Sequence, residues 1–168
     1  FLMTEDGEEN IIGFTNNITN PEGGTHVTGF KSAFAKLINN YARNELGTLK
    51  EKDSNLTGAD IRSGMQAIIS VKHPDPQFEG QTKTKLSNTD VSKAIDDIVK
   101  EQLTVYFDRN YDVLKDIVDR AVALSKRKAL EKSKININKF SFEGNGKLAK
   151  QESSDSSKCE IFIVEGDS

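Results

Sequence analysis

Apolar positions in the first third of the chain form two short strand-like runs and one long helical stripe. Ile11–Phe14 is a short apolar run, and we expect Phe1–Thr4 to be its hairpin partner across an acidic turn. After a cluster of breaker residues, Thr25 is a predicted N-cap for a helix that ends near Gly47. The apolar positions of this helix follow one another at intervals of three and four residues, and they are Val27, Phe30, Phe34, Leu37, Ile38 and Tyr41.

The middle of the chain predicts a short helix, a strand and two further helices. Thr57 begins the short helix, the side chain of Asp60 is expected to reach back to the first turn as in a capping box, and Gly64 ends the helix. Met65–Val71 is almost continuously apolar, which predicts a strand buried on both faces. A helix then starts at Ser87 or Asn88, and another follows after residue 110. Their stripes comprise Val91, Ile95, Ile98, Val99, Leu103 and Phe107, and then Leu114, Ile117, Val118, Ala121 and Leu124.

The last part of the chain has no periodic pattern until a final strand. Residues 135–158 are rich in Asn, Ser, Gly and Lys, which predicts an irregular linker, and Glu160–Val164 is strand-like. The mixture of strands and helices predicts an α+β (mixed α/β) fold. Because strand-like residues lie close to both ends, we expect the chain to be a piece of a longer protein.

Composition restricts the class of protein without naming a function. The 168 residues have a mean hydropathy of −0.56, and no apolar run approaches the roughly 18 residues that span a bilayer. We expect a cytoplasmic location, since no signal-like segment opens the chain. Cys159 is the single cysteine, so it has no internal disulfide partner. With one Cys and only two His in the whole sequence, a zinc site is not expected.

Charge is distributed unevenly, although the net charge is only −3. Residues 1–24 contain five acidic residues and no basic ones, whereas residues 115–150 contain ten basic and four acidic residues. A basic helix and linker would favour a polyanion such as DNA through counterion release. The same residues, among them Lys126, Arg127 and Lys128, equally suit the solvated C-terminal turns of a helix.

The segment Pro74–Leu86 carries the clearest chemical signal. It lies between the Met65–Val71 strand and the next helix, and it places Lys83 and Lys85 beside Gln81 and two threonines. Lysine supplies a point charge and the neutral side chains supply hydrogen-bond donors, which together suit a phosphate. On spacing alone, the segment also fits a solvated basic turn.

A second signal follows the final strand. Glu165 and Asp167 come directly after Val164, where α/β folds often build their sites, and two such carboxylates favour Mg²⁺. A bound Mg²⁺ would stabilise charge on a phosphodiester during cleavage or resealing. An ordinary turn containing Asp is the alternative.

Both segments resemble motifs of one family, the B subunits of bacterial type IIA topoisomerases, which include those of DNA gyrase and topoisomerase IV. Pro74–Leu86 closely resembles their ATP-contacting loop, and Phe162–Ser168 resembles the opening of their TOPRIM domain. Other segments that resemble their transducer domain, in the same order, are Phe14–Ile18, Glu22–His26, Gly29–Lys31, Asn40–Arg43 and Ile69–Val71.

The resemblance implies specific domains and roles. Residues 1–134 would be a transducer domain with a ribosomal S5 domain 2-like fold, residues 135–158 a linker, and residues 159–168 the start of TOPRIM. Lys83 would contact the γ-phosphate of ATP with Gln81 assisting, whereas Lys85 would act as a backup or face water. Glu165 would bind Mg²⁺ and act in DNA cleavage and religation.

The family also implies partners that this chain does not contain. They are DNA, an A-type subunit carrying the cleavage tyrosine, and a second B-type subunit joined through an ATPase domain; no membrane is involved. ATP and Mg²⁺ would serve the full-length enzyme, and the isolated chain is expected to be inactive and to bind neither. The linker departs from the family pattern at Asn145, Lys150 and Gln151.

Two alternatives remain from the sequence. The basic residues 115–150 are compatible with a DNA-binding clamp that has no nucleotide role. A kinase-like or mismatch-repair relative would explain Lys83, but it leaves the Glu165 motif unexplained.

Overall fold

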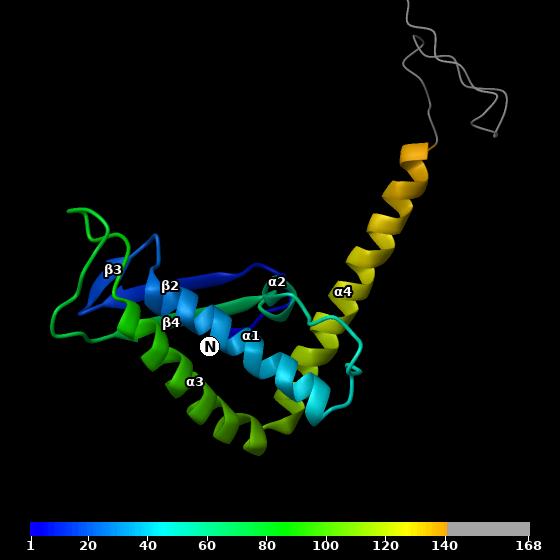
Figure 1. Cartoon of the computed structure of the whole chain (residues 1–168), viewed down its shortest axis with the longest axis horizontal. Coiled ribbons are helices and arrows are strands. Elements are labelled where there is room, and N and C mark those ends of the chain that lie inside the picture. The colour runs from blue at the N-terminus through cyan, green and yellow to red at the C-terminus, as the bar shows by residue number, and fades with distance from the viewer. Residues whose placement is uncertain (141–168) are drawn as a thin grey trace, which may run out of the picture. The chain divides into compact units, whose positions relative to one another are not determined.

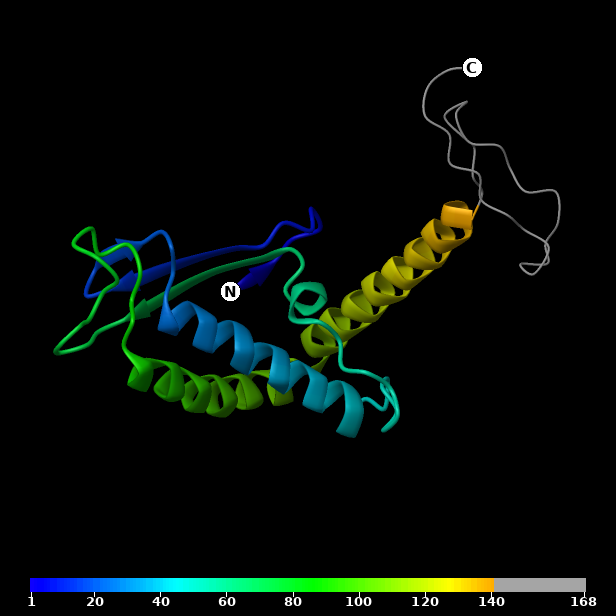
Figure 2. The same ribbon diagram turned by 45° about the horizontal axis from the view of Figure 1, so that its top comes forward.

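A four-stranded sheet lies over two long helices in the computed structural model, which describes residues 1–140 and side chains through Glu131 (Figures 1 and 2). The sheet and helices confirm the α+β class. The strands are β1 (Leu2–Met3), β2 (Asn10–Thr15), β3 (Ile18–Asn20) and β4 (Met65–Val71), and the helices are α1 (Thr25–Asn44), α2 (Gly58–Ile61), α3 (Thr89–Arg109) and α4 (Tyr111–Phe140).

The strand order is β1-β4-β2-β3, so the central pair is formed by β4 and β2. These two strands run parallel and in register through Thr15 and Val71, whereas β1 runs antiparallel to β4. The predicted hairpin of Phe1–Thr4 with Ile11–Phe14 is therefore wrong. Parallel strands need a long crossover, and α1 and α2 supply it before the chain returns as β4 between β1 and β2.

A tight hairpin joins β2 to β3. Thr15 pairs with Ile18, and the two residues between them have φ angles of 49° at Asn16 and 66° at Asn17. Two consecutive positive φ angles are typical of a type I′ turn, in which Asn is well tolerated. The turn therefore lies at the carboxyl end of β2, beside the end of β4.

β4 has the bounds that its apolar pattern predicts, but it is buried on one face only. Met65 and Ala67 are buried, whereas Ile68 is 69% exposed. Figure 2 shows α1 and α3 on the same side of the sheet, which explains the difference between the two faces. The prediction of burial on both faces is wrong because a continuous apolar run does not itself require two covering layers.

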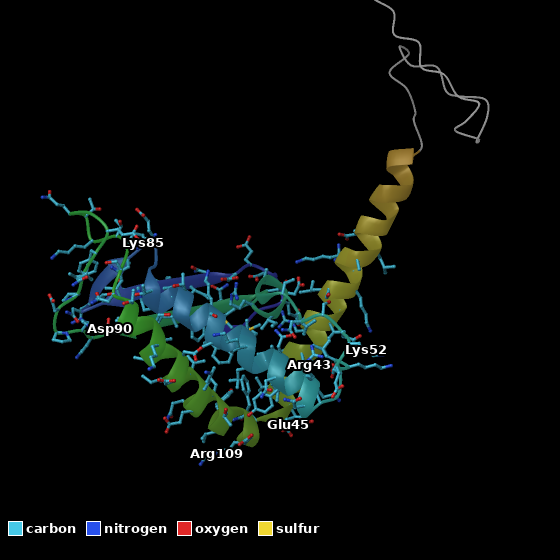
Figure 3. All side chains as sticks on the ribbon, viewed as in Figure 1. Arg43, Glu45, Lys52, Lys85, Asp90 and Arg109 are labelled. Atoms are coloured by element: carbon cyan, nitrogen blue, oxygen red, sulfur yellow. The ribbon has the colours of Figure 1, made fainter. Side chains whose placement is uncertain are left out.

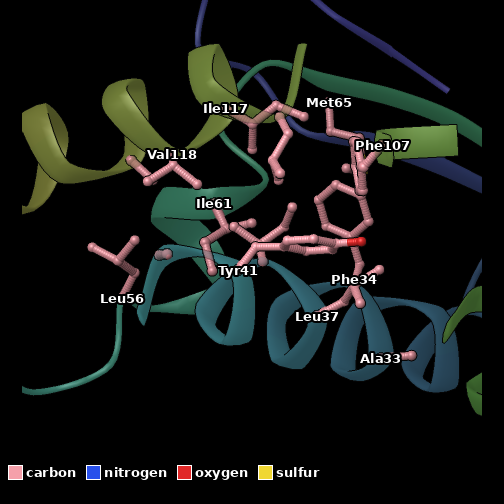
Figure 4. Packing of buried hydrophobic residues seen from close by; sticks show 14 of the residues in the cluster. Ala33, Phe34, Leu37, Tyr41, Leu56, Ile61, Met65, Phe107, Ile117 and Val118 are labelled. Atoms are coloured by element: carbon pink, nitrogen blue, oxygen red, sulfur yellow. The ribbon is translucent and has the colours of Figure 1, made fainter. Parts of the chain in front are cut away.

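The core lies between the sheet, α1, α3 and the first turns of α4 (Figure 4). Every residue of the predicted α1 stripe is buried, which confirms that helix. In α3, Val91, Val99 and Phe107 are buried, but Ile98 is 55% exposed and does not belong to the stripe. Residues Leu114, Ile117, Val118 and Ala121 of α4 complete the core.

The helix ends differ in part from the prediction. Gly24, not Thr25, is the N-cap of α1, and the Thr25 hydroxyl is buried without a hydrogen-bond partner among the described residues. Thr57 caps α2 as predicted, since its hydroxyl accepts from the Asp60 amide.

α4 extends to Phe140, so residues 135–140, which were predicted to begin an irregular linker, are helical. The rest of that linker and the strand Glu160–Val164 lie outside the described residues. Within residues 1–140, no helix is both long and apolar enough to cross a membrane.

Candidate phosphate-binding loop

Residues 72–88, here called the hairpin loop, extend from the carboxyl end of β4 to α3. The loop closes on itself because the Glu79 amide donates to the Lys85 carbonyl and the Ser87 amide to the Gln77 carbonyl, each at 2.9 Å. Gly80, with a φ angle of 78°, begins the turn at its tip. The predicted site residues Gln81 and Lys83 both lie at this tip and are exposed.

Two asparagines fasten the base of the hairpin loop. Asn16 pairs with the backbone of His73 in both directions, donating to its carbonyl and accepting from its amide at 2.8 Å. Asn88, at the N-cap of α3, accepts from the Gln77 amide at 2.7 Å and donates to the Asp75 carbonyl at 3.2 Å. The base of the loop is thus tied to the β2–β3 turn and to α3.

The C-terminal arm of the loop pairs with the segment that precedes α1. The Leu86 amide donates to the Gly23 carbonyl at 3.1 Å, and the Thr25 amide donates to the Leu86 carbonyl at 3.0 Å. Gly24 has a φ angle of 136°, and a Cβ at this position would lie 2.3 Å from the Leu86 carbonyl oxygen. A glycine is therefore required for this close approach.

Lys83 has an unusual backbone. Its φ angle of 55° lies in the left-handed region, which costs a non-glycine residue about 1–2 kcal/mol. The side-chain amide of Asn20 donates to the Lys83 carbonyl at 2.8 Å, and the Thr15 hydroxyl donates to the Asn20 side-chain oxygen at 2.7 Å. Thr15 and Asn20 are both almost fully buried.

The two lysines of the loop have different partners. The Lys85 ammonium forms an ion pair with the Glu79 carboxylate at 3.0 Å. The Lys83 ammonium lies 5.9 Å from the centre of the Phe78 ring, and no carboxylate pairs with it among the described residues. Lys83 therefore keeps its charge available for an anion, whereas Lys85 already has one.

Neutral donors surround Lys83 along the tip. Gln81 and Thr82 are exposed, and the hydroxyls of Thr82 and Thr84 lie 3.5 Å apart. An ammonium, an amide and hydroxyls together match the oxygens of a phosphate group, which accept several hydrogen bonds. The chemistry of the loop therefore fits a phosphate group.

His73 joins the base of the loop to α3 by a second contact. Its Nε2 lies 2.9 Å from the Asp90 carboxylate, and its Nδ1 accepts from the Asp75 amide at 3.2 Å. The hydrogen bond to Asp90 raises the pKa of His73 above its usual value near 6.5, and the same contact lowers the pKa of Asp90. The pair thus adds a contact between the base of the loop and the first turn of α3.

The depression between α1 and α3 that contains Tyr41 suits a phosphate less well than the loop does. This depression is lined by Tyr41, Thr104 and Asp108 among others, and no basic side chain belongs to its lining among the described residues. Burial raises the pKa of the Tyr41 phenol, which lies 3.3 Å from the Asp108 carboxylate. No cluster of His, Cys, Asp or Glu suited to a metal ion occurs in the part of the chain that is described. Glu165 lies outside that part.

Some cations of the basic segment already have partners inside the fold. Arg120 donates to the Thr4 carbonyl, and Lys128 forms an ion pair with the buried Asp60. Both contacts attach α4 to the rest of the fold, and the Lys128 side chain is still 55% exposed. The other basic residues of 115–131 remain compatible with either interpretation.

Sequence reasoning missed Thr15 and Asn20, which reach the candidate site from β2 and β3. Both precede or begin turn-rich segments, where polar residues are ordinary. The pairing of residues 22–25 with residues 84–86, next to the parallel β2–β4 pair, brings Asn20 near Lys83. No local pattern in the chain indicates that contact.

Comparison with known proteins gives a consistent result. The family model described as DNA gyrase B matches residues 1–136. The DNA gyrase B subunit of Clostridium acetobutylicum is 48% identical over 99% of this chain and 27% of its own length. The B subunit of the type 2 topoisomerase of Aquifex aeolicus is 46% identical over the whole chain and 22% of its own length.

Solved structures show the same relationship. The 43K ATPase domain of Thermus thermophilus gyrase B, in complex with an aminocoumarin, aligns with a TM-score of 0.71 at 36% identity, covering 79% of this chain and 36% of that one. The topoisomerase IV ATP-binding domain of Francisella tularensis aligns with a TM-score of 0.62 at 35% identity, covering 70% and 33%. The chain thus spans about a quarter of the curated relatives it matches.

Proposed function

Because the chain belongs to the DNA gyrase B family, the B subunits of type IIA topoisomerases, we propose that it is the part of such a subunit that couples ATP to DNA strand passage. Its whole protein would be an ATP-hydrolysing DNA topoisomerase. Lys83 contacts the γ-phosphate of ATP, and Gln81 assists it as a neutral donor. The ATP-binding pocket itself belongs to another part of the subunit.

The observation that carries this proposal is the state of Lys83. The backbone of this residue is held by buried side chains, while its ammonium has an aromatic ring rather than a carboxylate beside it. A cation with no competing anion can form a charge-assisted hydrogen bond to a phosphate without first giving up an ion pair. Lys85 lacks this freedom because Glu79 holds it.

A mechanical consequence follows from this contact. While the γ-phosphate is bound, Lys83 ties the transducer region to the nucleotide. Once phosphate leaves, the tie is lost and the region rotates as a rigid body, which is a common form of switching transition. α4 is one continuous helix from Tyr111 to Phe140 and would carry the motion towards the DNA-cleaving region.

The remaining assignments complete the proposal. Residues 1–134 form the transducer domain, residues 135–158 the linker, and residues 159–168 the start of TOPRIM, where Glu165 would hold Mg²⁺ and take part in DNA cleavage. Mg²⁺ would stabilise charge on the phosphodiester. The partners would be DNA, an A-type subunit and a second B-type subunit, in the cytoplasm.

The test replaces one lysine at a time in the full-length subunit assembled with its A-type partner. Lys83→Ala should lower ATP turnover and ATP-dependent strand passage by about 10²–10³-fold, the usual effect of removing one donor from a developing negative charge. Lys85→Ala is the matched control, since it deletes the same charge two residues away, and should stay within a few-fold of wild type. Normal turnover and strand passage in Lys83→Ala would refute the proposal.

A DNA-binding clamp without a nucleotide role is the second candidate, favoured by the basic stretch that begins in α4. It predicts that charge reversal at Lys126 and Arg127 weakens DNA binding and flattens its salt dependence. Under the nucleotide proposal, such variants leave ATP turnover without DNA unchanged. Measuring both quantities on the same variants separates the two functions.

A further inference from the structure

We propose that Asn20 is a positioning residue for the nucleotide contact, acting through the backbone of Lys83 and itself oriented by Thr15. The inference rests on the proposed role of Lys83 and goes beyond it, because Asn20 lies in β3, 63 residues away in the chain. It concerns why Lys83 is presented correctly, not which group meets the phosphate.

The backbone of Lys83 needs an external restraint. A lysine in the left-handed region is disfavoured relative to the ordinary regions, so an isolated loop would leave this conformation. The hydrogen bond from Asn20 to the Lys83 carbonyl holds one peptide group of the unfavourable turn. One residue further, the Glu22 amide holds the Thr84 carbonyl at 3.1 Å, which restrains the next peptide group.

The orientation of the Asn20 amide is determined on both sides. The Lys83 carbonyl oxygen can only accept, so the NH₂ group of Asn20 must face it. The Asn20 side-chain oxygen then faces the Thr15 hydroxyl, which donates to it at 2.7 Å. Since Thr15 is 0% and Asn20 1% exposed, water does not compete for these bonds.

This arrangement also explains why only the backbone of Lys83 is held. The restraint acts on the carbonyl, and the ammonium lies 5.9 Å from the centre of the Phe78 ring. The loop thus combines a backbone set by the sheet with a side chain free to meet an incoming phosphate. If the restraint were removed, the ammonium would be displaced from the phosphate while its charge stayed intact.

The test uses the full-length subunit assembled with its partner and measures ATP turnover. Asn20→Ala should lower kcat for ATP hydrolysis by about 10- to 100-fold, as expected when a binding group is misplaced by about 1 Å. Thr15→Val removes only the orienting hydroxyl at nearly constant volume and should reproduce part of the loss. Thr15→Ser, which keeps the hydroxyl, should restore it. These two variants keep the test decisive if Asn20→Ala fails to fold.

A matched control distinguishes positioning from general destabilisation. Asn39 is also a buried asparagine that pairs with backbone groups, since it donates to the carbonyls of Ala35 and Leu56 and accepts from the Leu56 amide, but it lies in the middle of α1. Asn39→Ala should lower the melting temperature at least as much as Asn20→Ala while leaving kcat and KM for ATP unchanged. An equal loss of kcat in both variants would assign Asn20 a merely structural role.

Combining variants completes the test. In a Lys83→Ala background, Asn20→Ala should reduce turnover by less than about twofold further, because the residue through which it acts is absent. If the double variant lost turnover by the product of the two single losses, the inference would be overturned. Wild-type turnover in Asn20→Ala beside a strong loss in Lys83→Ala would overturn it as well. Wild-type turnover in Lys83→Ala itself would instead overturn the proposed function together with this inference.

Discussion

The hairpin loop (residues 72–88) and the loop of residues 45–57, here called the corner loop, meet opposite ends of α1 and use their cations in opposite ways. Figure 3 shows Lys85 and Asp90 at one end, and Arg43 and Lys52 at the other. Arg43, in the last turn of α1, donates to the carbonyls of Lys50 and Asp53 and to the Asn55 side chain, so the corner loop closes around a cation that α1 supplies. The hairpin loop holds its backbone by other residues and leaves Lys83 without a carboxylate among the described residues.

The difference separates a cation that holds a loop together from a cation that has no carboxylate partner among the described residues. Arginine suits the corner loop because its planar fork satisfies several carbonyl oxygens at once. Lysine suits the hairpin loop because it is a mobile point charge on a flexible stem. The type of charge is the same in both loops, and the partners decide its role.

The largest effect that would sharpen this comparison is on stability. Arg43→Ala should lower the free energy of unfolding by about 1–3 kcal/mol, because several carbonyl and amide oxygens lose their donor. Lys83→Ala should change it by less than about 0.5 kcal/mol, as for an ordinary surface residue. Chemical denaturation of both variants measures the difference, with Lys52→Ala as the control within the corner loop. A stable Arg43→Ala would show that the corner loop does not depend on its cation.

A smaller effect should appear as a dependence on pH. Because Asp90 raises the pKa of His73, their contact stabilises the fold fully below the usual histidine value near 6.5 and loses this contribution as the pH rises through the raised value. On the acid side, the contribution falls as the pH drops through the lowered pKa of Asp90. Asp90→Asn should therefore destabilise the protein more at about pH 6 than at about pH 8. Melting curves across this window test the prediction, and a constant difference would contradict it.

The smallest effect is expected at the exposed ion pair of the hairpin loop. Glu79→Gln removes the partner of Lys85, and surface pairs of this kind contribute about 0–1 kcal/mol, so the unfolding free energy should barely change. The more informative measurement is the ATP turnover of Lys83→Ala/Glu79→Gln compared with Lys83→Ala. A partial recovery would show that Lys85 can replace Lys83 once it is released from Glu79.

Local patterns in the sequence were sufficient for most of the elements. The α1 stripe is buried at every predicted position, and β4 has its predicted bounds, because both depend on spacing within one segment. The pairing partner of β1 and the exposed face around Ile68 were predicted wrongly. Both depend on which distant segment lies alongside, and periodicity carries no information about that.

In the candidate site, too, the features that depend on neighbouring residues were predicted and those that depend on distant segments were not. Gln81 and Lys83 lie together at the loop tip, as their adjacency in the chain requires, although their roles remain predictions. The restraint from Asn20 and Thr15, and the pairing of Lys85 with Glu79, were not predicted. A contact between residues 20 and 83 arises only when distant segments pair, here β2 with β4 and residues 22–25 with residues 84–86, and the ion pair depends on the closed shape of the loop.

The parallel pairing of β2 with β4 also has a kinetic consequence. Contacts that join residues dozens of positions apart form late, since the chain must first close a large loop. The left-handed turn at Lys83 therefore matures only when the central strands have come together, and a synthetic peptide covering residues 72–88 would lack it. A partly folded molecule would accordingly lack the restrained backbone on which the proposed phosphate contact of Lys83 depends.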